Sequence, residues 1–386
     1  MDSHLKTVST FVQAAQPLLV HVICVLGLAI RPRSLAISIT LPLMTWVLSK
    51  SLLRDPRAYG EEYSLNSYLM MFPWIWLDWV VMGNSDREQW RRIDAKSTEK
   101  SGTKGVRGDV PRNFMARLKW AGRLTANPRL LGYSSQIAKM PKGYAPDLPR
   151  SWAILRKVLR MLYFVGVIVA IKFVFAQTSY TTYYDNHGHP RSDVLTRPGW
   201  LEGMLFAWLF ILSGYAGIEA CFALTAVVAL ALGSPVHTVP PAGGDATQMY
   251  TVRKCWGEVW HGLLRRLCTA PGNYLAHDVF HLARGTFGSR YLKLFVAFFV
   301  SACVHSFGAM LTMRTFQDNG DFAWFFAQAI AIFVEDHVIL FGKKIFGTQH
   351  ATFWRTVGYA WVIVWYGLSI QHYLFSMYSR GMSMVS

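Results

Sequence analysis

The sequence is poor in charge and in cysteine. Only 16% of its 386 residues are charged, whereas soluble domains carry about 25%. Its five cysteines are scattered over a long chain without a C-x-x-C pair, which excludes a disulfide-rich secreted scaffold. No P-loop, G-x-G-x-x-G motif, heptad array or internal repeat occurs in the sequence. The chemistry of the chain therefore has to be sought in other residues.

Apolar and aromatic residues are plentiful and occur in long blocks. Hydrophobic residues make up 52% and aromatic residues 15% of the chain, which excludes a disordered protein. The formal charge is +17, and the basic residues crowd between the apolar blocks. A DNA-binding protein is also basic, but its charge lies on soluble modules rather than beside lipid-length stretches. The sequence therefore predicts a polytopic membrane protein.

Several apolar blocks are long enough to cross a bilayer as helices, because about 20 residues span the hydrocarbon core. We expect an all-α membrane protein with roughly eight to ten transmembrane helices. The candidate spans are 11–30, 34–53, 65–82, 154–176, 200–232, 290–313, 322–342 and 354–378. The block 200–232 either forms one long tilted helix or two short helices, although the distribution of loop charge favours a single crossing.

Positive charge in the loops predicts the orientation of the chain. The loop 84–151 holds 15 Lys and Arg against 6 Asp and Glu, so it should be cytosolic. Its second half, with Phe114, Leu118, Trp120 and Leu124 among polar residues, predicts an amphipathic helix at the membrane surface. This pattern divides the chain into N-terminal transmembrane helices (1–83), the basic loop (84–151) and a second transmembrane region (152–386). The last region contains a cytosolic loop at about 233–289. The ionisable residues described next make 152–386 the candidate catalytic region and this loop the candidate active-site loop.

Ionisable side chains within the spans are costly and are functional candidates by default. His305 lies among small residues, where a neutral imidazole either accepts a proton near neutral pH or only ties two helices together. Gln328 and Glu335 are seven residues apart and share one helix face, so we expect them to line the cavity of His305. Asp336 follows directly and either has a partner or reaches the wet interface.

The loop 233–289 carries the densest run of aromatic and ionisable residues. Trp256 and Trp260 are four residues apart, on one face of a helix, which is typical of packing or of an interfacial belt. His261, followed by Arg265 and Arg266, adds a polar and cationic edge that would suit a pantetheine arm and its phosphates. From these residues alone, the loop is either a packing or interfacial segment or a binding surface for an anionic acyl carrier.

The histidines of this loop show one further pattern. His277 and His281 are spaced as a metal pair, but the H-E-x-x-H glutamate and a third ligand are missing. No metal site is predicted.

Three blocks of this sequence resemble motifs of one known family. The run from Cys255 to Arg266 is similar to the FWGRRWHQLLR-type signature of the wax-synthase-like branch of the membrane-bound O-acyltransferases. The run from Phe298 to His305 resembles the FFxSGxxH motif of that branch, and Gln328 with Glu335-Asp336 resembles its Q…ED block. The blocks agree in order and spacing and cover about the last third of the chain.

The resemblance implies a bundle of transmembrane helices around an intramembrane reaction chamber in which an acyl group passes from acyl-CoA to an alcohol. His305 matches the histidine that acts as general base, and His261 matches the loop position beside the acyl donor, where it would donate to the thioester carbonyl. Residues in or near the matching blocks become candidates for binding the substrate or acyl-CoA: Trp256, Trp260, Arg265, Asn273, Gln328, Glu335 and Asp336.

The sequence also departs from these motifs. Cys255 stands in place of an aromatic residue, and Ala302 stands in place of a glycine. Glu258 and Val259 stand where the signature has two arginines. The chain therefore lacks two cations that would attract the phosphates of CoA.

Chain length and the N-terminal pattern resemble fungal acetyltransferases of terpenoid and meroterpenoid biosynthesis. The resemblance implies acetyl-CoA as co-substrate, a lipophilic alcohol as acceptor, no permanently bound cofactor, no nucleic acid partner, and a location in the endoplasmic reticulum. The oligomeric state stays open. One alternative is a long-chain acyl-CoA:alcohol acyltransferase that makes wax esters or triacylglycerol. A second alternative is a proton-coupled transporter in which His305, Glu335 and Asp336 relay protons.

Overall fold

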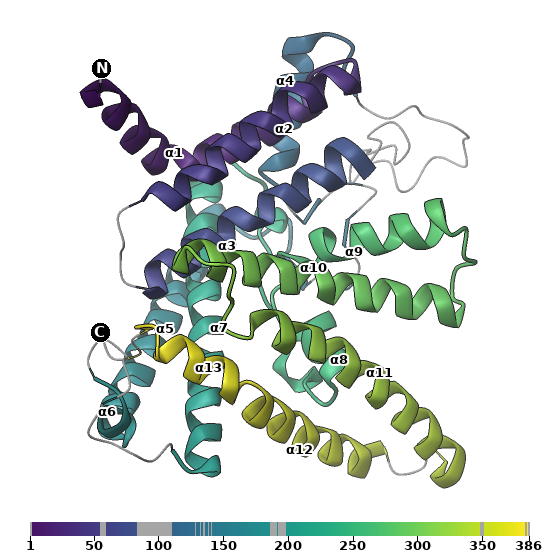
Figure 1. Ribbon diagram of the computed structural model, residues 1–386. Helices are drawn as coiled ribbons and strands as arrows, with labels where there is room; N and C mark the ends of the chain where they lie inside the picture. The colour runs from purple at the N-terminus through teal and green to yellow at the C-terminus, as the bar shows by residue number, and fades with distance from the viewer. Residues whose placement is uncertain are drawn as a thin grey trace. The chain divides into compact units, whose positions relative to one another are not determined.

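All regular elements of the described residues are helical in the computed structural model (Figure 1). This result confirms the all-α class. The structure describes residues 2–54, 59–82, 110–127, 129–131, 133, 136–137, 139, 141–185, 191, 198–347, 351–382 and 384. The first part of the predicted basic loop, residues 84–109, lies outside these described residues.

The chain folds into two compact units, each made of segments that are far apart in sequence. Unit 1 comprises Met1–Ile137 and Leu264–Phe326, and unit 2 comprises Ala138–Leu263 and Ala327–Ser386. Unit 1 holds α1 (Asp2–Ala29), α2 (Arg33–Ser49), α3 (Tyr59–Trp76), α4 (Phe114–Thr125), α9 (Arg265–Tyr274), α10 (Phe287–Met313) and the first residues of α11 (Asp321–Phe346). Unit 2 holds α5 (Arg150–Gln177), α6 (Tyr180–Tyr183), α7 (Trp200–Ala231), α8 (Val252–Lys254), the rest of α11, α12 (Ala351–Ser369) and α13 (Gln371–Tyr378). The division of the chain at residues 83 and 151 stays a prediction.

Five of the described helices are long and apolar enough to cross a membrane by themselves. They are α2 with the turn after it, α5, α7, α10 and most of α11. The block 200–232 forms one unbroken helix, α7, so Gly214 and Gly217 do not divide it. The predicted spans 11–30, 65–82 and 354–378 also form helices, but these do not reach the same length and hydropathy, and the last one is divided at Ile370 into α12 and α13.

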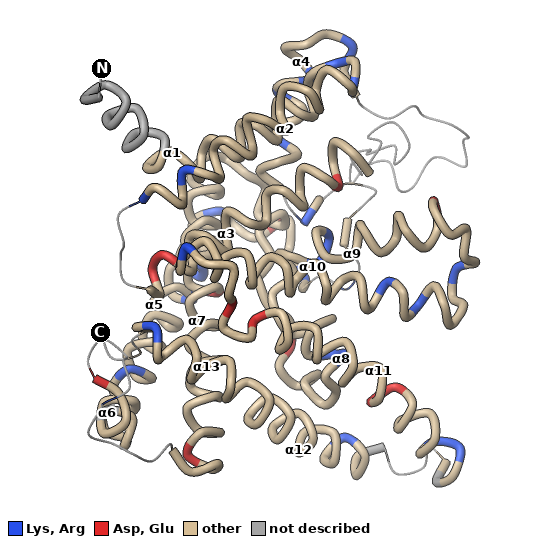
Figure 2. Tube along the Cα trace, in the orientation of Figure 1, with Lys and Arg blue, Asp and Glu red and all other residues tan. Residues whose placement is uncertain are grey.

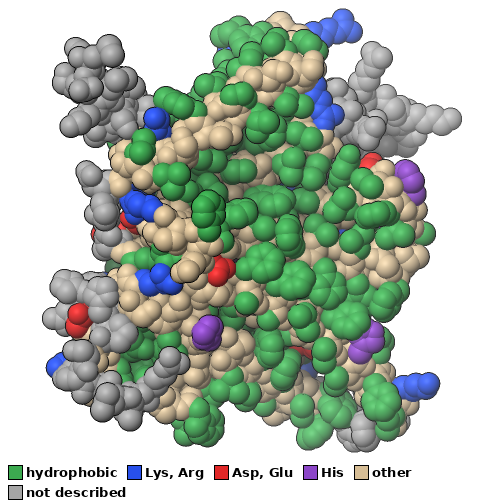
Figure 3. Space-filling model, in the orientation of Figure 1, with side chains coloured by type: hydrophobic (Ala, Val, Ile, Leu, Met, Phe, Trp, Pro, Cys, Tyr) green, Lys and Arg blue, Asp and Glu red, His purple; other side chains and the backbone are tan. Residues whose placement is uncertain are grey.

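The surface agrees with a lipid environment. Large hydrophobic side chains are exposed along the long helices, including Trp46 on α2, Phe173 on α5 and Phe307 on α10. Hydrophobic atoms cover much of the face seen in Figure 3, and charged residues are sparse along the long helices in Figure 2. Because a soluble surface rarely has such continuous apolar area, the described helices favour an integral membrane protein.

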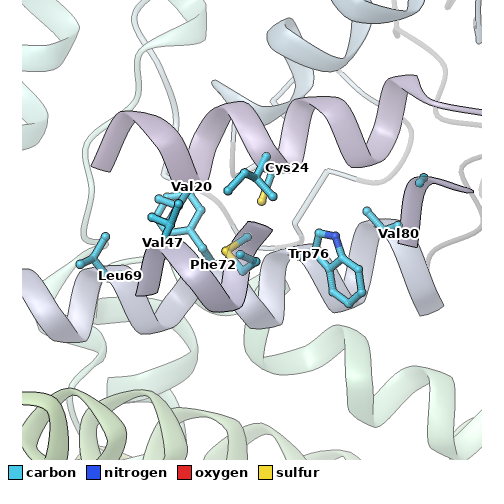
Figure 4. Close-up of a cluster of buried hydrophobic side chains, with 10 residues drawn as sticks. Val20, Cys24, Val47, Leu69, Phe72, Trp76 and Val80 are labelled. Atoms are coloured by element: carbon cyan, nitrogen blue, oxygen red, sulfur yellow. The ribbon is translucent and has the colours of Figure 1, made fainter. Parts of the chain in front are cut away.

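The core of unit 1 lies between α1, α2 and α3. Apolar residues at helical spacing on these three helices bury one another, and the Trp76 indole donates to Thr40 Oγ1 over 2.8 Å. Figure 4 shows Val20 and Cys24 from α1, Val47 from α2, Leu69, Phe72 and Trp76 from α3, and Val80 from the turn after it.

The predicted amphipathic helix is α4, and its apolar face is buried in protein. Trp120 and Leu124 pack in one cluster with Leu28 of α1 and with Trp79. Asn113 caps the first turn by accepting from the backbone N–H of Ala116, as expected for an N-cap. The buried side of α4 is therefore occupied by α1, and the sequence pattern alone did not distinguish this partner from lipid headgroups.

Helices α3 and α10 of unit 1 approach each other closely. A Cβ atom on Gly308 of α10 would lie 2.8 Å from the Cα atom of Ser67 of α3, so only a glycine fits there. One turn away, Asn66 donates to the hydroxyl of Thr312 over 3.0 Å. Small residues allow such close helix packing in membranes, and this contact fixes α3 beside the candidate histidine of α10.

In unit 2, α5 and α7 pack along their lengths and share a buried ion pair. The Arg160 guanidinium donates to Glu219 Oε2 over 3.0 Å, and Glu219 is 1% exposed. The other carboxylate oxygen of Glu219 accepts from the backbone N–H of Gly243 over 2.6 Å. An acidic residue inside an apolar helix thus attaches the Pro- and Gly-rich start of the loop 233–289 to α7.

Candidate active site

His305 lies on α10 in a small polar cluster of unit 1. Its Nδ1 atom is 3.1 Å from the phenolic oxygen of Tyr63 on α3. The same Tyr63 hydroxyl donates to Asp321 Oδ1 over 2.6 Å. Phe325, one turn along α11 from Asp321, stacks on the imidazole ring with centroids 4.0 Å apart and planes 9° apart. Helices α3 and α11 therefore contact an edge and a face of the His305 ring.

Asp321 is fully buried, and its second carboxylate oxygen also accepts hydrogen bonds. Oδ2 accepts from the backbone N–H and from the side-chain amide of Asn319, each over 3.2 Å. The side chain of Asn319 also donates to the hydroxyl of Tyr59. Hydrogen-bond donors of this kind favour the ionised form of a carboxylate.

The acidic pair Glu335 and Asp336 of α11 holds the start of the loop signature in unit 2. Glu335 accepts from the backbone N–H groups of Val252 and Arg253, over 2.6 and 3.2 Å, at the beginning of α8. Asp336 accepts from Arg253 Nε over 2.9 Å and also from a terminal nitrogen of that guanidinium. Carboxylates at a helix N-terminus satisfy its unpaired N–H groups, so both residues position the loop.

The face shared by Gln328 and Glu335 is confirmed, and it packs against tryptophans of α12. The Trp361 indole donates to Glu335 over 3.0 Å, and the Trp365 indole donates to Gln328 over 3.0 Å. Trp256 of the loop also points its indole N–H at the Gln328 oxygen, at 3.4 Å. Gln328 therefore joins the loop signature to the membrane helices.

The loop signature forms a π-helical turn at Cys255–Val259 and then becomes extended at Trp260. The rings of Trp256 and Trp260 meet edge to face with centroids 5.9 Å apart, so the two predicted tryptophans do lie together. The start of the loop holds the turn in place, because the backbone N–H of Gly244 donates to the carbonyl of Val259 over 2.9 Å. A Cβ atom on Gly244 would collide with the carbonyl of Glu258.

His261 follows this turn and carries a buried polar atom without a partner. Its Nδ1 atom is buried and makes no hydrogen bond, and its ring lies 5.4 Å from that of Trp260. Removal from water lowers the pKa of His261 to about 4, because burial disfavours the charged imidazolium. At neutral pH the ring is therefore uncharged, and its buried Nδ1 atom makes no hydrogen bond within the described residues.

The loop cysteines are not suited to act as nucleophiles. Burial and, to a smaller extent, the charge of the nearby Glu335 raise the pKa of Cys255 to about 12. Burial also raises the pKa of Cys268 to about 12. Because the thiolate is the nucleophilic form, neither side chain offers a ready acceptor for a covalent acyl group at neutral pH.

Two candidates at and after the end of the signature, Arg265 and Asn273, lie in unit 1, on α9. Arg265 is the first residue of that helix and is partly exposed, and Asn273 is exposed near its end. Arg266 forms an ion pair with Asp78, in which Nε lies 2.8 Å from the carboxylate and both side chains are largely buried. The charge of Arg266 is thus neutralised within the protein, so the cationic edge expected beside His261 loses one member.

The candidates fall into two groups. His305, Arg265 and Asn273 belong to unit 1, whereas the others belong to unit 2: Trp256, Trp260, His261, Gln328, Glu335 and Asp336. A cavity shared by His305 and the face of Gln328 and Glu335 stays a prediction, as do the individual binding roles. Within the described part of the chain, no group of three or more His, Cys, Asp or Glu side chains is arranged to hold a metal ion.

Sequence reasoning missed the partners of His305. Tyr63 is 242 positions away from His305, and Asp321 precedes the polar residues that the motif singles out. A signal did exist, because Tyr63 follows two acidic residues at the start of an apolar block and Asp321 opens another. No spacing rule connects the two blocks to each other.

Known proteins resemble this chain over most of its length. The model of the membrane bound O-acyl transferase family matches residues 239–327, which include the loop signature and His305. The acetyltransferase sirH of Leptosphaeria maculans is 31% identical over 383 residues, which is 98% of this chain and 94% of the relative. The acetyltransferase eriL of Hericium erinaceus is 28% identical over 69% of this chain and 68% of its own length. The O-Mevalon transferase macI of Penicillium terrestre is 26% identical over 74% of this chain and 70% of its own length. No solved structure matches.

Proposed function

Because this chain belongs to the membrane-bound O-acyltransferase family and is an acyl-transferring membrane enzyme, we propose that it transfers an acetyl group from acetyl-CoA to a hydroxyl of a lipophilic terpenoid or meroterpenoid. The observation that carries this proposal is the similarity to a fungal acetyltransferase along 98% of the chain. It is supported by the placement of His305 on a membrane helix with a phenol and a carboxylate behind its ring.

The proposed reaction needs a base, because an alcohol is a poor nucleophile at neutral pH. The neutral His305 imidazole takes the hydroxyl proton while the alcohol oxygen attacks the thioester carbonyl. The carbon–sulfur bond then breaks, and the imidazolium returns the proton to the CoA thiolate. The products are the acetate ester and free CoA, so no proton is gained or lost overall. A positioned general base contributes about 10²–10⁴-fold to such a rate.

The donor half of the proposal rests on the loop signature. The unpartnered Nδ1 atom of His261 lies beside the paired tryptophans, and burial keeps its ring neutral. A neutral imidazole N–H in this place donates to the thioester oxygen as negative charge develops on it. The aromatic faces of Trp256 and Trp260 pack against the apolar part of the pantetheine arm.

The two partners would reach the enzyme by different routes. CoA is soluble and polyanionic, so it approaches from the positively charged cytosolic side. A polycyclic alcohol partitions into the bilayer and arrives laterally. The endoplasmic reticulum is the proposed location, in keeping with the resemblance of the chain to fungal membrane acetyltransferases.

Two competing functions are transfer of a long acyl chain and proton-coupled transport. Several relatives carry names that describe acetyl transfer, which favours acetyl over long-chain donors and favours an enzyme over a proton-coupled transporter. One relative is named an O-Mevalon transferase, so a larger polar acyl group is a second candidate donor.

The test is release of free CoA thiol by microsomes that contain the protein. Acetyl-CoA, palmitoyl-CoA and mevalonyl-CoA are each supplied with a panel of polycyclic terpenoid alcohols, and the ester is identified by mass spectrometry. We expect release with acetyl-CoA only when an alcohol is present. His305→Ala should abolish it, and His337→Ala, which changes an exposed histidine of α11, should leave it unchanged.

Each other outcome contradicts a defined part of the proposal. Release with palmitoyl-CoA alone moves the protein to long-chain ester synthesis. Normal turnover in His305→Ala removes His305 as the base. If the wild-type protein consumes no donor with any alcohol, the proposed acceptor class is wrong.

A further inference from the structure

A chain of two hydrogen bonds links a buried carboxylate to His305. Asp321 is 0% exposed and Tyr63 is 6% exposed, so water does not compete freely for either group. The Tyr63 oxygen lies 2.6 Å from Asp321 Oδ1 and 3.1 Å from His305 Nδ1. The phenol is therefore the only step between the acid and the imidazole ring along this path.

The direction of the protons follows from what each group can donate. An ionised carboxylate only accepts hydrogen bonds, whereas a phenol has one proton to donate. Tyr63 must then donate its proton to Asp321, which is the nearer of the two groups. Its oxygen can take part in the second bond only as an acceptor, so His305 has to carry a proton on Nδ1.

We propose that Tyr63 and Asp321 are positioning residues that hold neutral His305 as the Nδ1–H tautomer, so that Nε2 bears the lone pair that accepts the alcohol proton. This inference rests on the proposed function for its kinetic consequences, but the tautomer itself is a property of the protein. Phe325 completes the arrangement, because stacking on the ring restricts its rotation out of this plane.

The surroundings of Asp321 mean that replacing one of its carboxylate oxygens with an NH₂ group would reverse the direction of these two hydrogen bonds. Two donors of Asn319 face Oδ2. In Asp321→Asn the amide oxygen must remain on that side, because an NH₂ group there would face two other donors. The new NH₂ group then turns toward Tyr63 and donates to it. Tyr63 would consequently donate to His305, and the ring would change to the Nε2–H tautomer, which is no base at that nitrogen.

The direct test is the tautomer of His305 in the purified full-length protein, read by nitrogen NMR of a sample with ¹⁵N-labelled histidine. The His305 signals are identified by their absence from His305→Ala. We expect the Nδ1–H form in the wild type, a mixture of tautomers in Tyr63→Phe, and the Nε2–H form in Asp321→Asn. A wild-type ring protonated mainly on Nε2 would overturn the proposal.

The kinetic test compares single and double variants in the microsomal assay. Tyr63→Phe should lower kcat by roughly 10- to 100-fold, less than the roughly 10²–10⁴-fold lost with the base itself, while KM for acetyl-CoA stays within about two-fold. Asp321→Asn should be more harmful than Tyr63→Phe. The double variant should recover to the level of Tyr63→Phe, because without the hydroxyl no reversed hydrogen bond reaches His305.

The control is Tyr68→Phe, which removes a hydroxyl from the same helix at a residue that is 37% exposed, and it should leave kcat unchanged. Wild-type kcat in Tyr63→Phe, or a double variant no better than Asp321→Asn, would refute the positioning role. If a variant does not fold, the wild-type tautomer still decides. If no donor and alcohol react at all, the function fails, while the NMR result judges this inference independently.

Discussion

The buried imidazole of His261 should make the stability of the protein depend on pH. In the folded chain burial lowers the pKa of His261 to about 4, from 6.5 for an unperturbed histidine. Above about pH 6.5 the ring is neutral in both states and contributes no pH dependence. As the pH falls below that value, the unfolded chain binds a proton that the folded chain cannot accept, so the free energy of unfolding decreases until about pH 4.

The two pKa values set the size of this effect. Between about pH 7.5 and pH 5, linkage gives a loss of about 2 kcal/mol from this one group. The entropy of unfolding scales with chain length, so the loss corresponds to roughly 2–3 °C in the midpoint of thermal unfolding. In His261→Asn the side chain cannot become charged, and its amide occupies the place of the Nδ1 atom.

The assay is thermal unfolding in detergent at the two pH values, followed by tryptophan fluorescence. The wild type should lose roughly 2–3 °C more than His261→Asn on acidification. His237→Asn, a change at an exposed histidine of the same unit, should behave like the wild type. An equal loss in the wild type and His261→Asn would refute the buried neutral imidazole, and with it the reason for expecting a ligand at Nδ1.

Two further predictions concern packing and charge. Gly308→Ala should cost about 1–3 kcal/mol of stability and lower activity, because the new Cβ atom would lie 2.8 Å from the Cα of Ser67. The control Gly342→Ala, with open space around it, should be harmless. Equal behaviour of the two variants in thermal unfolding and CoA release would contradict this reasoning. Arg253→Ala should cost about 2 kcal/mol of stability, because it leaves the buried Asp336 carboxylate without its ion pair. This is below the about 3–5 kcal/mol of fully buried pairs, because 35% of the Arg253 side chain is exposed. In a denaturant titration the double variant Arg253→Ala with Asp336→Asn should be more stable than Arg253→Ala alone, and the opposite order would refute this prediction.

Local patterns predicted the parts of the candidate site that lie within one segment. The seven-residue spacing of Gln328 and Glu335 correctly placed them on one face of a helix, because helical periodicity needs no tertiary information. The spacing of Trp256 and Trp260 predicted one face of a helix; the two rings do meet, but Trp260 lies in extended backbone after the π-helical turn. What these residues face was not predictable, since the tryptophans Trp361 and Trp365 of another helix select the partners.

Charge in the loop shows the same limit. Arg266 reads as a cation for an anionic ligand when only its neighbours are considered. In the fold it is paired with Asp78, which lies 188 positions earlier in the chain. The sequence counts charges, but only the packing of helices decides which of them are neutralised within the protein.

By itself, the sequence determined that the chain is an all-α membrane protein, and it singled out three polar blocks near its end as the candidate site. Hydropathy and motif order are properties of short segments, and both can be read along the chain. Only the tertiary structure decided that Tyr63 and Asp321 stand behind His305, that Glu335 and Asp336 hold the loop, and that His261 keeps a buried nitrogen without a partner. These facts depend on which helices approach each other, and a close approach such as that of α3 and α10 at Gly308 is set by packing between segments that are far apart in the chain.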